Sequence, residues 1–117
     1  MKQQDFARTL TGEEEIHIMV VRKGNRKKRI LPVWFVTEES TLHLLPMYGL
    51  KTRWFQDIEA SGALQIRARE QKKNVSPKIV RDPTAVDRVK RLFGRKYGFG
   101  DVRKYYPTSE VALEIGL

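Results

Sequence analysis

Lys51 and Thr52 are the residues of this sequence that are best placed to bind an anion. They follow a turn that contains Gly49 and begin an amphipathic segment, residues 51–60, that predicts a helix with Thr52 as its N-cap. The first turn of a helix presents backbone N–H groups without intrahelical partners, and a neighbouring ammonium group adds a charged donor. The sequence therefore predicts a phosphate site at the start of this helix.

Two apolar, β-rich segments lead into this turn and predict a hairpin. Residues 29–36 read Arg-Ile-Leu-Pro-Val-Trp-Phe-Val, residues 41–47 read Thr-Leu-His-Leu-Leu-Pro-Met, and a short polar break separates them. Because Pro32 has no N–H to donate, it is expected at a sheet edge, at a bulge, or at a point where something other than a strand pairs with the backbone. Both segments are apolar on both faces, so we expect the core on one side and a helix, a ligand or a second subunit on the other. A flat apolar wall beside a phosphate site suits a flavin-like cofactor.

The remaining periodicity predicts a single, mainly β domain over residues 1–117. The expected strands cover residues 15–22, 28–37, 41–47, 64–69, 75–81 and 111–115. The expected helices cover residues 3–10, 51–60, a segment that starts at Asp82-Pro83, and 99–106. Residues 71–74 are expected to form a turn. Hairpin-length links between most strands favour an antiparallel sheet, so the predicted fold class is α+β, a six-stranded antiparallel barrel with short helices.

Composition limits the kinds of site that the chain can contain. It has 117 residues and no cysteine, which excludes disulfides, zinc–thiolate sites and cysteine nucleophiles. The two histidines, His17 and His43, do not have a metal-ligand spacing with the carboxylates, and His43 is expected to pack rather than to catalyse. No apolar run approaches the roughly 18 residues that span a bilayer, and no secretory signal is visible. The expectation is a soluble, cytoplasmic protein.

The net charge of +9 predicts a polyanionic partner. Six of the eight residues from 22 to 29 are basic, and the basic C-terminal segment is interleaved with Tyr97, Phe99, Tyr105 and Tyr106. Cations mixed with aromatic side chains are typical of proteins that bind single-stranded nucleic acid. A non-enzymatic, basic β-barrel module that binds nucleic acid is therefore the alternative to a site for a phosphorylated cofactor. The plain interpretation of both basic segments is solvated surface.

Three segments of the chain resemble the split β-barrel flavin-binding proteins, which include pyridoxamine phosphate oxidase-like proteins and the deazaflavin-dependent nitroreductase family. The segments are Arg29-Ile-Leu-Pro-Val-Trp-Phe, Leu42-His-Leu-Leu and Gly49-Leu-Lys-Thr-Arg-Trp-Phe. Residues 58–66 are also similar to the family's passage from a helix into its fourth strand. The resemblance covers residues 15–70, and the C-terminal part only by the order of its elements.

The resemblance implies a homodimer with a cofactor at the subunit interface. It implies that Arg29, Lys51 and Thr52 meet the cofactor phosphate and that the isoalloxazine ring lies against the backbone of residues 32–34. A bound flavin performs the redox chemistry itself, so the implied function is an oxidoreductase that transfers hydride to an unidentified small molecule. The implied cofactor-binding residues are Arg29, Pro32, Val33, Trp34, Met47, Gly49, Lys51, Thr52 and Trp54.

The choice between FMN and a deazaflavin stays open. The deazaflavin branch often shows Gly-Arg-Lys-Ser-Gly before its second strand, whereas this chain has Arg22-Lys-Gly-Asn-Arg26 at that place. The implied cofactor is FMN, with a deazaflavin coenzyme as the alternative.

Overall fold

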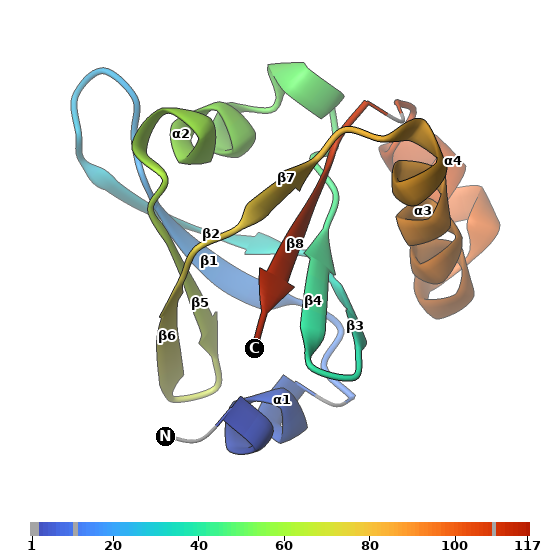
Figure 1. Ribbon diagram of the computed structural model, residues 1–117, viewed down its shortest axis with the longest axis horizontal. Helices are drawn as coiled ribbons and strands as arrows, with labels where there is room; N and C mark the ends of the chain where they lie inside the picture. Colours follow the sequence, from blue (N-terminus) through green and yellow to red (C-terminus); the bar gives the residue numbers. More distant parts are fainter. Residues whose placement is uncertain (1–2, 11, 109) are drawn as a thin grey trace.

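The computed structural model describes residues 3–10, 12–108 and 110–117, whose strands form two four-stranded antiparallel sheets (Figure 1). The first sheet has the order β2-β1-β5-β6, with strands Lys28–Val33, Ile16–Val21, Leu64–Ala68 and Gln71–Val75. The second has the order β3-β4-β8-β7, with strands Val36–Glu38, Thr41–Leu44, Ala112–Gly116 and Lys78–Val80. The helices are α1 (Gln3–Leu10), the 3-10 helix η1 (Gly49–Lys51), α2 (Arg53–Ser61), α3 (Pro83–Tyr97) and α4 (Phe99–Tyr105). The predicted α+β class is confirmed.

The predicted number of strands was wrong, because the described residues form eight strands and not six. The predicted strand 28–37 is in fact two strands: β2 ends at Val33, and the chain then crosses from the first sheet to the second through Trp34 and Phe35. The expected position of Pro32 is confirmed, because β2 is an edge strand and a missing N–H is tolerated there.

The predicted turn at residues 71–74 was also wrong. These residues belong to β6, which pairs with β5, and the chain reverses instead at Arg69 and Glu70, where Arg69 has a φ of 55°. Since β6 is the other edge of the first sheet, its side chains are mostly polar and none is fully buried, as is usual for an edge strand. Its sequence therefore lacks the apolar alternation that marks a strand.

Two apolar clusters fill the molecule, one on each side of the second sheet. The larger lies between the two sheets and includes Phe35, Leu42 and Leu44. The smaller packs α3 and α4 against the outer face of the second sheet and includes Val36 and Leu45. Strand β4 is thus covered on both faces within one chain, whereas the face of β2 that carries Ile30 and Pro32 is exposed.

Local signals explain where the helices begin and end. Asp82 caps α3 through its carboxylate, which accepts a hydrogen bond from the Ala85 N–H at 3.0 Å. Gly62 ends α2 in the left-handed conformation, as predicted. Gly94 lies inside α3, where a Cβ would overlap the ring of Phe99 from α4. None of the helices in the described part of the chain has the length and apolarity needed to cross a bilayer.

Candidate functional site

A cavity of about 660 Å³ lies beside β2 and the start of α2 and brings together all the residues predicted to bind a cofactor except Gly49. Small-molecule sites commonly have volumes of about 300–1,000 Å³. The predicted residues that line it are Arg29, Pro32, Val33, Trp34, Met47, Lys51, Thr52 and Trp54. The other lining residues are Glu15, Leu31, Leu45, Tyr48, Arg53, Tyr105 and Tyr106.

Trp34 forms an aromatic wall of the cavity and is held in place by residues from α3 and α4. Its ring stacks on Tyr97, with centroids 4.1 Å apart and planes 6° apart, and meets Tyr105 edge-on at 5.8 Å. Tyr106 approaches it at 6.1 Å. Aromatic pairs in these geometries add attraction beyond their buried area, so this wall is fixed before any ligand arrives.

The hydroxyl of Tyr97 anchors that wall to the crossing between the sheets. It accepts a hydrogen bond from the Phe35 N–H at 3.0 Å and lies 2.6 Å from the Glu14 carbonyl oxygen, to which it donates. Burial raises the pKa of Tyr97 to about 12. The sequence indicated Tyr97 only as part of a basic, aromatic surface, because its contact with Phe35 spans 62 residues of sequence.

Lys96 reinforces the same crossing and is not a freely solvated cation. Its ammonium group donates to the Phe35 carbonyl oxygen at 2.9 Å and lies 3.5 Å from the centre of the Phe35 ring. Desolvation of the ammonium group lowers the pKa of Lys96. The backbone of Phe35, next to Trp34, is thus held by both Tyr97 and Lys96.

Three cations line the cavity without a partner of opposite charge. Within the described part of the chain, the side chains of Arg29, Lys51 and Arg53 form no hydrogen bond or ion pair, and Glu15 is the one acidic side chain in the lining. Cations in surface ion pairs would be neutralised locally, whereas these leave a net positive potential over an apolar cavity. This arrangement suits a ligand with an anionic group and a flat apolar body.

Thr52 occupies the predicted N-cap position of α2 but does not cap the helix with its side chain. Its Oγ1 accepts a hydrogen bond from the Tyr48 N–H at 2.8 Å instead. The hydroxyl proton remains available for donation. Among the described residues, the N–H groups in the first turn of α2 have no side-chain acceptor, and Lys51 lies directly before them. That they bind an anion together stays a prediction.

Gly49 lies outside the lining of the cavity and has a structural role. Its φ is 59°, and a Cβ at this position would overlap the side chains of Thr108 and Glu110. The Glu110 carboxylate accepts a hydrogen bond from the Leu50 N–H at 3.2 Å. Gly49 therefore allows the turn before Lys51 to approach the segment that follows α4.

Three solved structures share this fold at low sequence identity. A putative pyridoxamine 5'-phosphate oxidase from Listeria innocua has a TM-score of 0.70 and 12% identity, over 97% of this chain and 90% of that one. An F420-H2-dependent reductase has a TM-score of 0.67 and 10% identity, over 88% and 94% of the two chains. A heme storage protein from Vibrio cholerae has a TM-score of 0.72 and 12% identity, over 99% and 90%.

At these identities the likeness shows the fold alone. The fold of the split β-barrel proteins, which the sequence resembles, is confirmed. No curated protein matches the chain. Residues 7–112 match the family described as "Uncharacterized protein conserved in bacteria (DUF2255)", and the chain belongs to that family.

Proposed function

We propose that the cavity beside α2 binds a flavin-type cofactor, FMN or a deazaflavin, and that the protein is an oxidoreductase that transfers hydride to a small molecule. One observation carries this proposal: Arg29, Lys51 and Arg53, which have no charged partner among the described residues, surround an apolar cavity that has an aromatic wall. The likeness in fold to a reductase and to a pyridoxamine phosphate oxidase supports it.

Each part of the cavity has a role in holding such a cofactor. Lys51, Arg29 and the first turn of α2 bind its phosphate through charge-assisted hydrogen bonds. The backbone of residues 32–34 and the side chains of Met47 and Trp54 contact the ring system. When bound, the flavin supplies the hydride chemistry. The protein binds and orients it and keeps water from the ring.

The test is cofactor binding to the purified protein, followed by visible absorption and flavin fluorescence. We expect Lys51→Ala to weaken cofactor affinity by about 1.5–3 kcal/mol, the usual contribution of a hydrogen bond to a charged group. Lys72→Ala is the matched control, because Lys72 is exposed on β6 and lies outside the cavity. It removes the same charge and should leave the affinity nearly unchanged.

Two results would count against this proposal. Equal losses in Lys51→Ala and Lys72→Ala would mean that the net charge attracts anions without a dedicated phosphate site. Failure of both FMN and a deazaflavin to bind at high micromolar concentration would exclude the cofactor. Heme and single-stranded DNA serve as competing ligands in the same assay. DNA binding that persists at physiological salt, in the absence of flavin binding, would instead favour the nucleic-acid module.

A further inference from the structure

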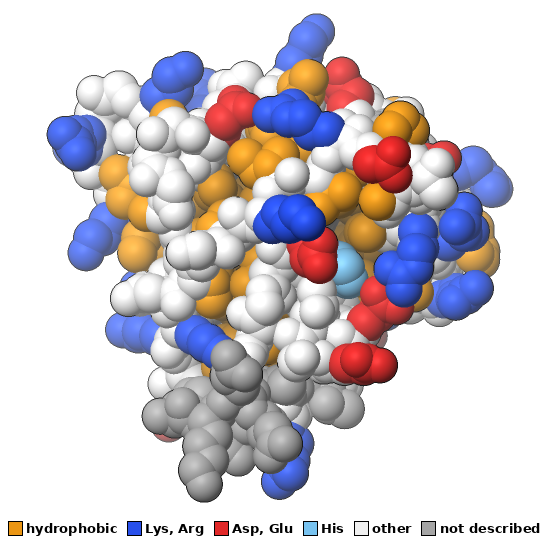
Figure 2. Space-filling view, in the orientation of Figure 1, with side chains coloured by type: hydrophobic (Ala, Val, Ile, Leu, Met, Phe, Trp, Pro, Cys, Tyr) orange, Lys and Arg blue, Asp and Glu red, His pale blue; other side chains and the backbone are white. Residues whose placement is uncertain are grey.

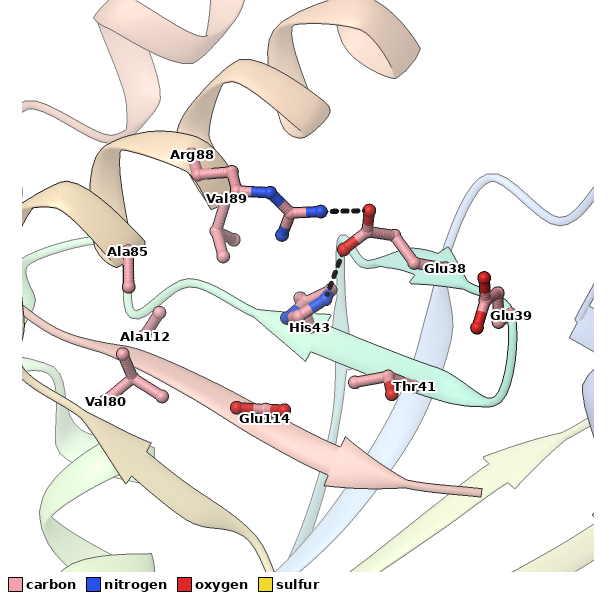
Figure 3. A pocket seen from close by; sticks show the side chains of 10 residues that line it. All are labelled: Glu38, Glu39, Thr41, His43, Val80, Ala85, Arg88, Val89, Ala112 and Glu114. Carbon is pink, nitrogen blue, oxygen red and sulfur yellow. Dashed lines mark hydrogen bonds and ion pairs between the residues drawn. The ribbon is translucent and has the colours of Figure 1, made fainter.

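A second cavity, of about 340 Å³, lies between the second sheet and α3 (Figure 3). It shares no lining residue with the proposed cofactor cavity. Its volume lies at the lower end of the range of about 300–1,000 Å³ that is common for small-molecule sites. Its lining consists of Glu38, Glu39, Thr41, His43, Val80, Ala85, Arg88, Val89, Ala112 and Glu114.

His43 is held in the wall of this cavity by a chain of charged partners. His43 is 6% exposed, and its Nε2 atom lies 3.1 Å from one carboxylate oxygen of Glu38. The other oxygen of Glu38 accepts a hydrogen bond from Arg88, which holds the pKa of Glu38 below its usual range. Since a carboxylate can only accept, Nε2 is the donor, and Nδ1 of the neutral ring carries the lone pair.

The Nδ1 atom of His43 faces the cavity and lacks a partner. Figure 3 shows the second ring nitrogen directed away from Glu38, toward the space bounded by Ala85, Ala112 and Glu114. In the described part of the chain this atom makes no hydrogen bond. The Nδ1 atom is not itself enclosed, so a hydrogen-bond donor that enters the cavity can reach this acceptor.

Glu114 adds a second acceptor next to His43. The two residues are direct partners across β4 and β8, which places their side chains on the same face of the sheet. Lys78 lies opposite Glu114 on β7, but within the described residues Lys78 forms no ion pair with Glu114.

The lining of this second cavity contains three glutamates and one arginine, on a chain whose net charge is +9. In Figure 2 a histidine is visible on this face between acidic and basic side chains.

The opposite side of the cavity is apolar and is formed by small side chains. These side chains are Val80, Ala85, Val89 and Ala112. A ligand that fits must carry hydrogen-bond donors and a positive charge at one end and a short hydrocarbon body at the other. A metal ion fits less well, because no three histidine, aspartate or glutamate side chains of the described residues come together to hold one.

We propose that this cavity binds a small primary alkylamine as its ammonium ion. The ammonium group has three donors and no acceptor. It donates to Nδ1 of His43 and to the carboxylate of Glu114, while the alkyl chain packs against Val80, Ala85 and Val89. This site is independent of the cofactor proposed above, and either could exist without the other.

The experiment is a titration of the full-length, 15N-labelled protein with n-butylamine near neutral pH, followed by NMR of the histidine side chains. The His17→Gln variant assigns the remaining signal to His43. We expect a saturable shift of the His43 signal with n-butylamine. We expect no such shift with n-butanol, which lacks the charge, or with butyrate, which reverses it.

Two variants are expected to lose the site while the protein stays folded. Glu114→Gln removes a charged acceptor, and Ala85→Leu fills the apolar side of the cavity, so each should weaken n-butylamine binding at least roughly tenfold. The control is Glu70→Gln, which removes the same charge at the turn between β5 and β6 and should leave binding unchanged. The proposal is overturned if the His43 signal does not respond up to ~10 mM n-butylamine, a concentration at which even weak specific binding is visible. It is also overturned if Glu70→Gln weakens binding as much as Glu114→Gln does.

Discussion

Tyr97 shows how one residue connects the aromatic wall to the backbone that supports it. Its ring stacks on Trp34, and its hydroxyl bonds the backbone of Phe35 and Glu14. The hydroxyl is therefore not needed for contact with a ligand but for the position of the residues beside it. Burial is the main reason that its pKa rises from 10.0 to about 12.

The Tyr97→Phe variant separates these two roles. It keeps the stacking ring and leaves the Phe35 N–H without its acceptor, so we expect a loss of about 1–3 kcal/mol of stability. The unfolded chain releases the tyrosine proton near pH 10.0 and the folded chain near pH 12. Between these values the unfolded state binds fewer protons, so the stability of the wild type falls as pH rises, and this part of the slope disappears in the variant.

Absorbance at 295 nm and urea unfolding at several pH values measure both effects. The difference between the alkaline titrations of the wild type and Tyr97→Phe should have its midpoint near pH 12. The control variant, Tyr48→Phe, changes a residue that is 62% exposed and should leave this transition in place. A difference titration centred near pH 10 would show that Tyr97 is not anchored in the way described.

The residues of the cavity could be predicted only where they are close in sequence. Lys51 and Thr52 were found because a turn followed by a helix start is a local signal. Arg53 lies at the same helix start, but it was not among the residues predicted to bind a cofactor. Tyr105 and Tyr106 join Trp34 only through the packing of α4, across about seventy residues, which no local pattern encodes. Whether any of these residues contacts a cofactor stays a prediction.

At the scale of elements, the β1–β2 hairpin is attached to α2 through one buried carboxylate. Asp57 of α2 is 1% exposed, and its Oδ1 accepts a hydrogen bond from the Lys23 N–H at 2.8 Å. Its Oδ2 has no partner among the described residues. This contact holds the basic hairpin that leads to Arg29. Asp57 therefore helps to position a residue of the cavity, although it does not line the cavity itself.

We expect Asp57→Ala to destabilise the fold by about 1–3 kcal/mol, because the Lys23 N–H loses its acceptor at a part-buried contact. Asp57→Asn keeps an acceptor and removes a buried charge, so it should cost less. Asp87→Ala, at an exposed position of α3, is the control. Urea unfolding gives the stabilities, and amide hydrogen exchange at Lys23 reports the hairpin. Unchanged unfolding of Asp57→Ala would mean that solvent replaces this contact without loss.

Helices were easier to predict than strands for a physical reason. The caps of α2 and α3 are decided by residues within one turn, such as Gly62 and Asp82, so their positions follow from the sequence. The division of residues 28–37 depends on which sheet each half pairs with. Residues 28–33 pair with β1 and residues 36–38 pair with β4, and both pairings depend on tertiary structure.

At the scale of the whole molecule, positively charged side chains are spread over the surface, and a few of them line the cavity beside α2. Figure 2 shows Lys and Arg side chains spread around the outline of the visible face. A net charge of +9 raises the local concentration of anions and speeds their encounter with the protein. Specific binding then depends on where unpaired cations meet a shaped cavity, as Arg29, Lys51 and Arg53 do beside Trp34.

Exposed apolar side chains on the turn before α2 predict that the chain forms a homodimer. Tyr48, which lines the cavity beside α2, and Leu50 lie exposed on the turn before that helix, and Leu50 is 38% exposed. A second copy of the chain that buries these side chains would also close the cavity. We therefore expect a homodimer, with a mass in light scattering near twice 13.7 kDa.

Leu50→Asp should give a monomer, because a charge at an apolar contact must be desolvated without a partner. Phe99→Asp is the matched control: Phe99 is 50% exposed on α4, away from the cavity lining, and its replacement should leave the dimer intact. The monomeric Leu50→Asp variant should also bind cofactor more weakly. A wild type that scatters as a monomer at micromolar concentration, or two variants that dissociate equally, would show that this turn is not the interface.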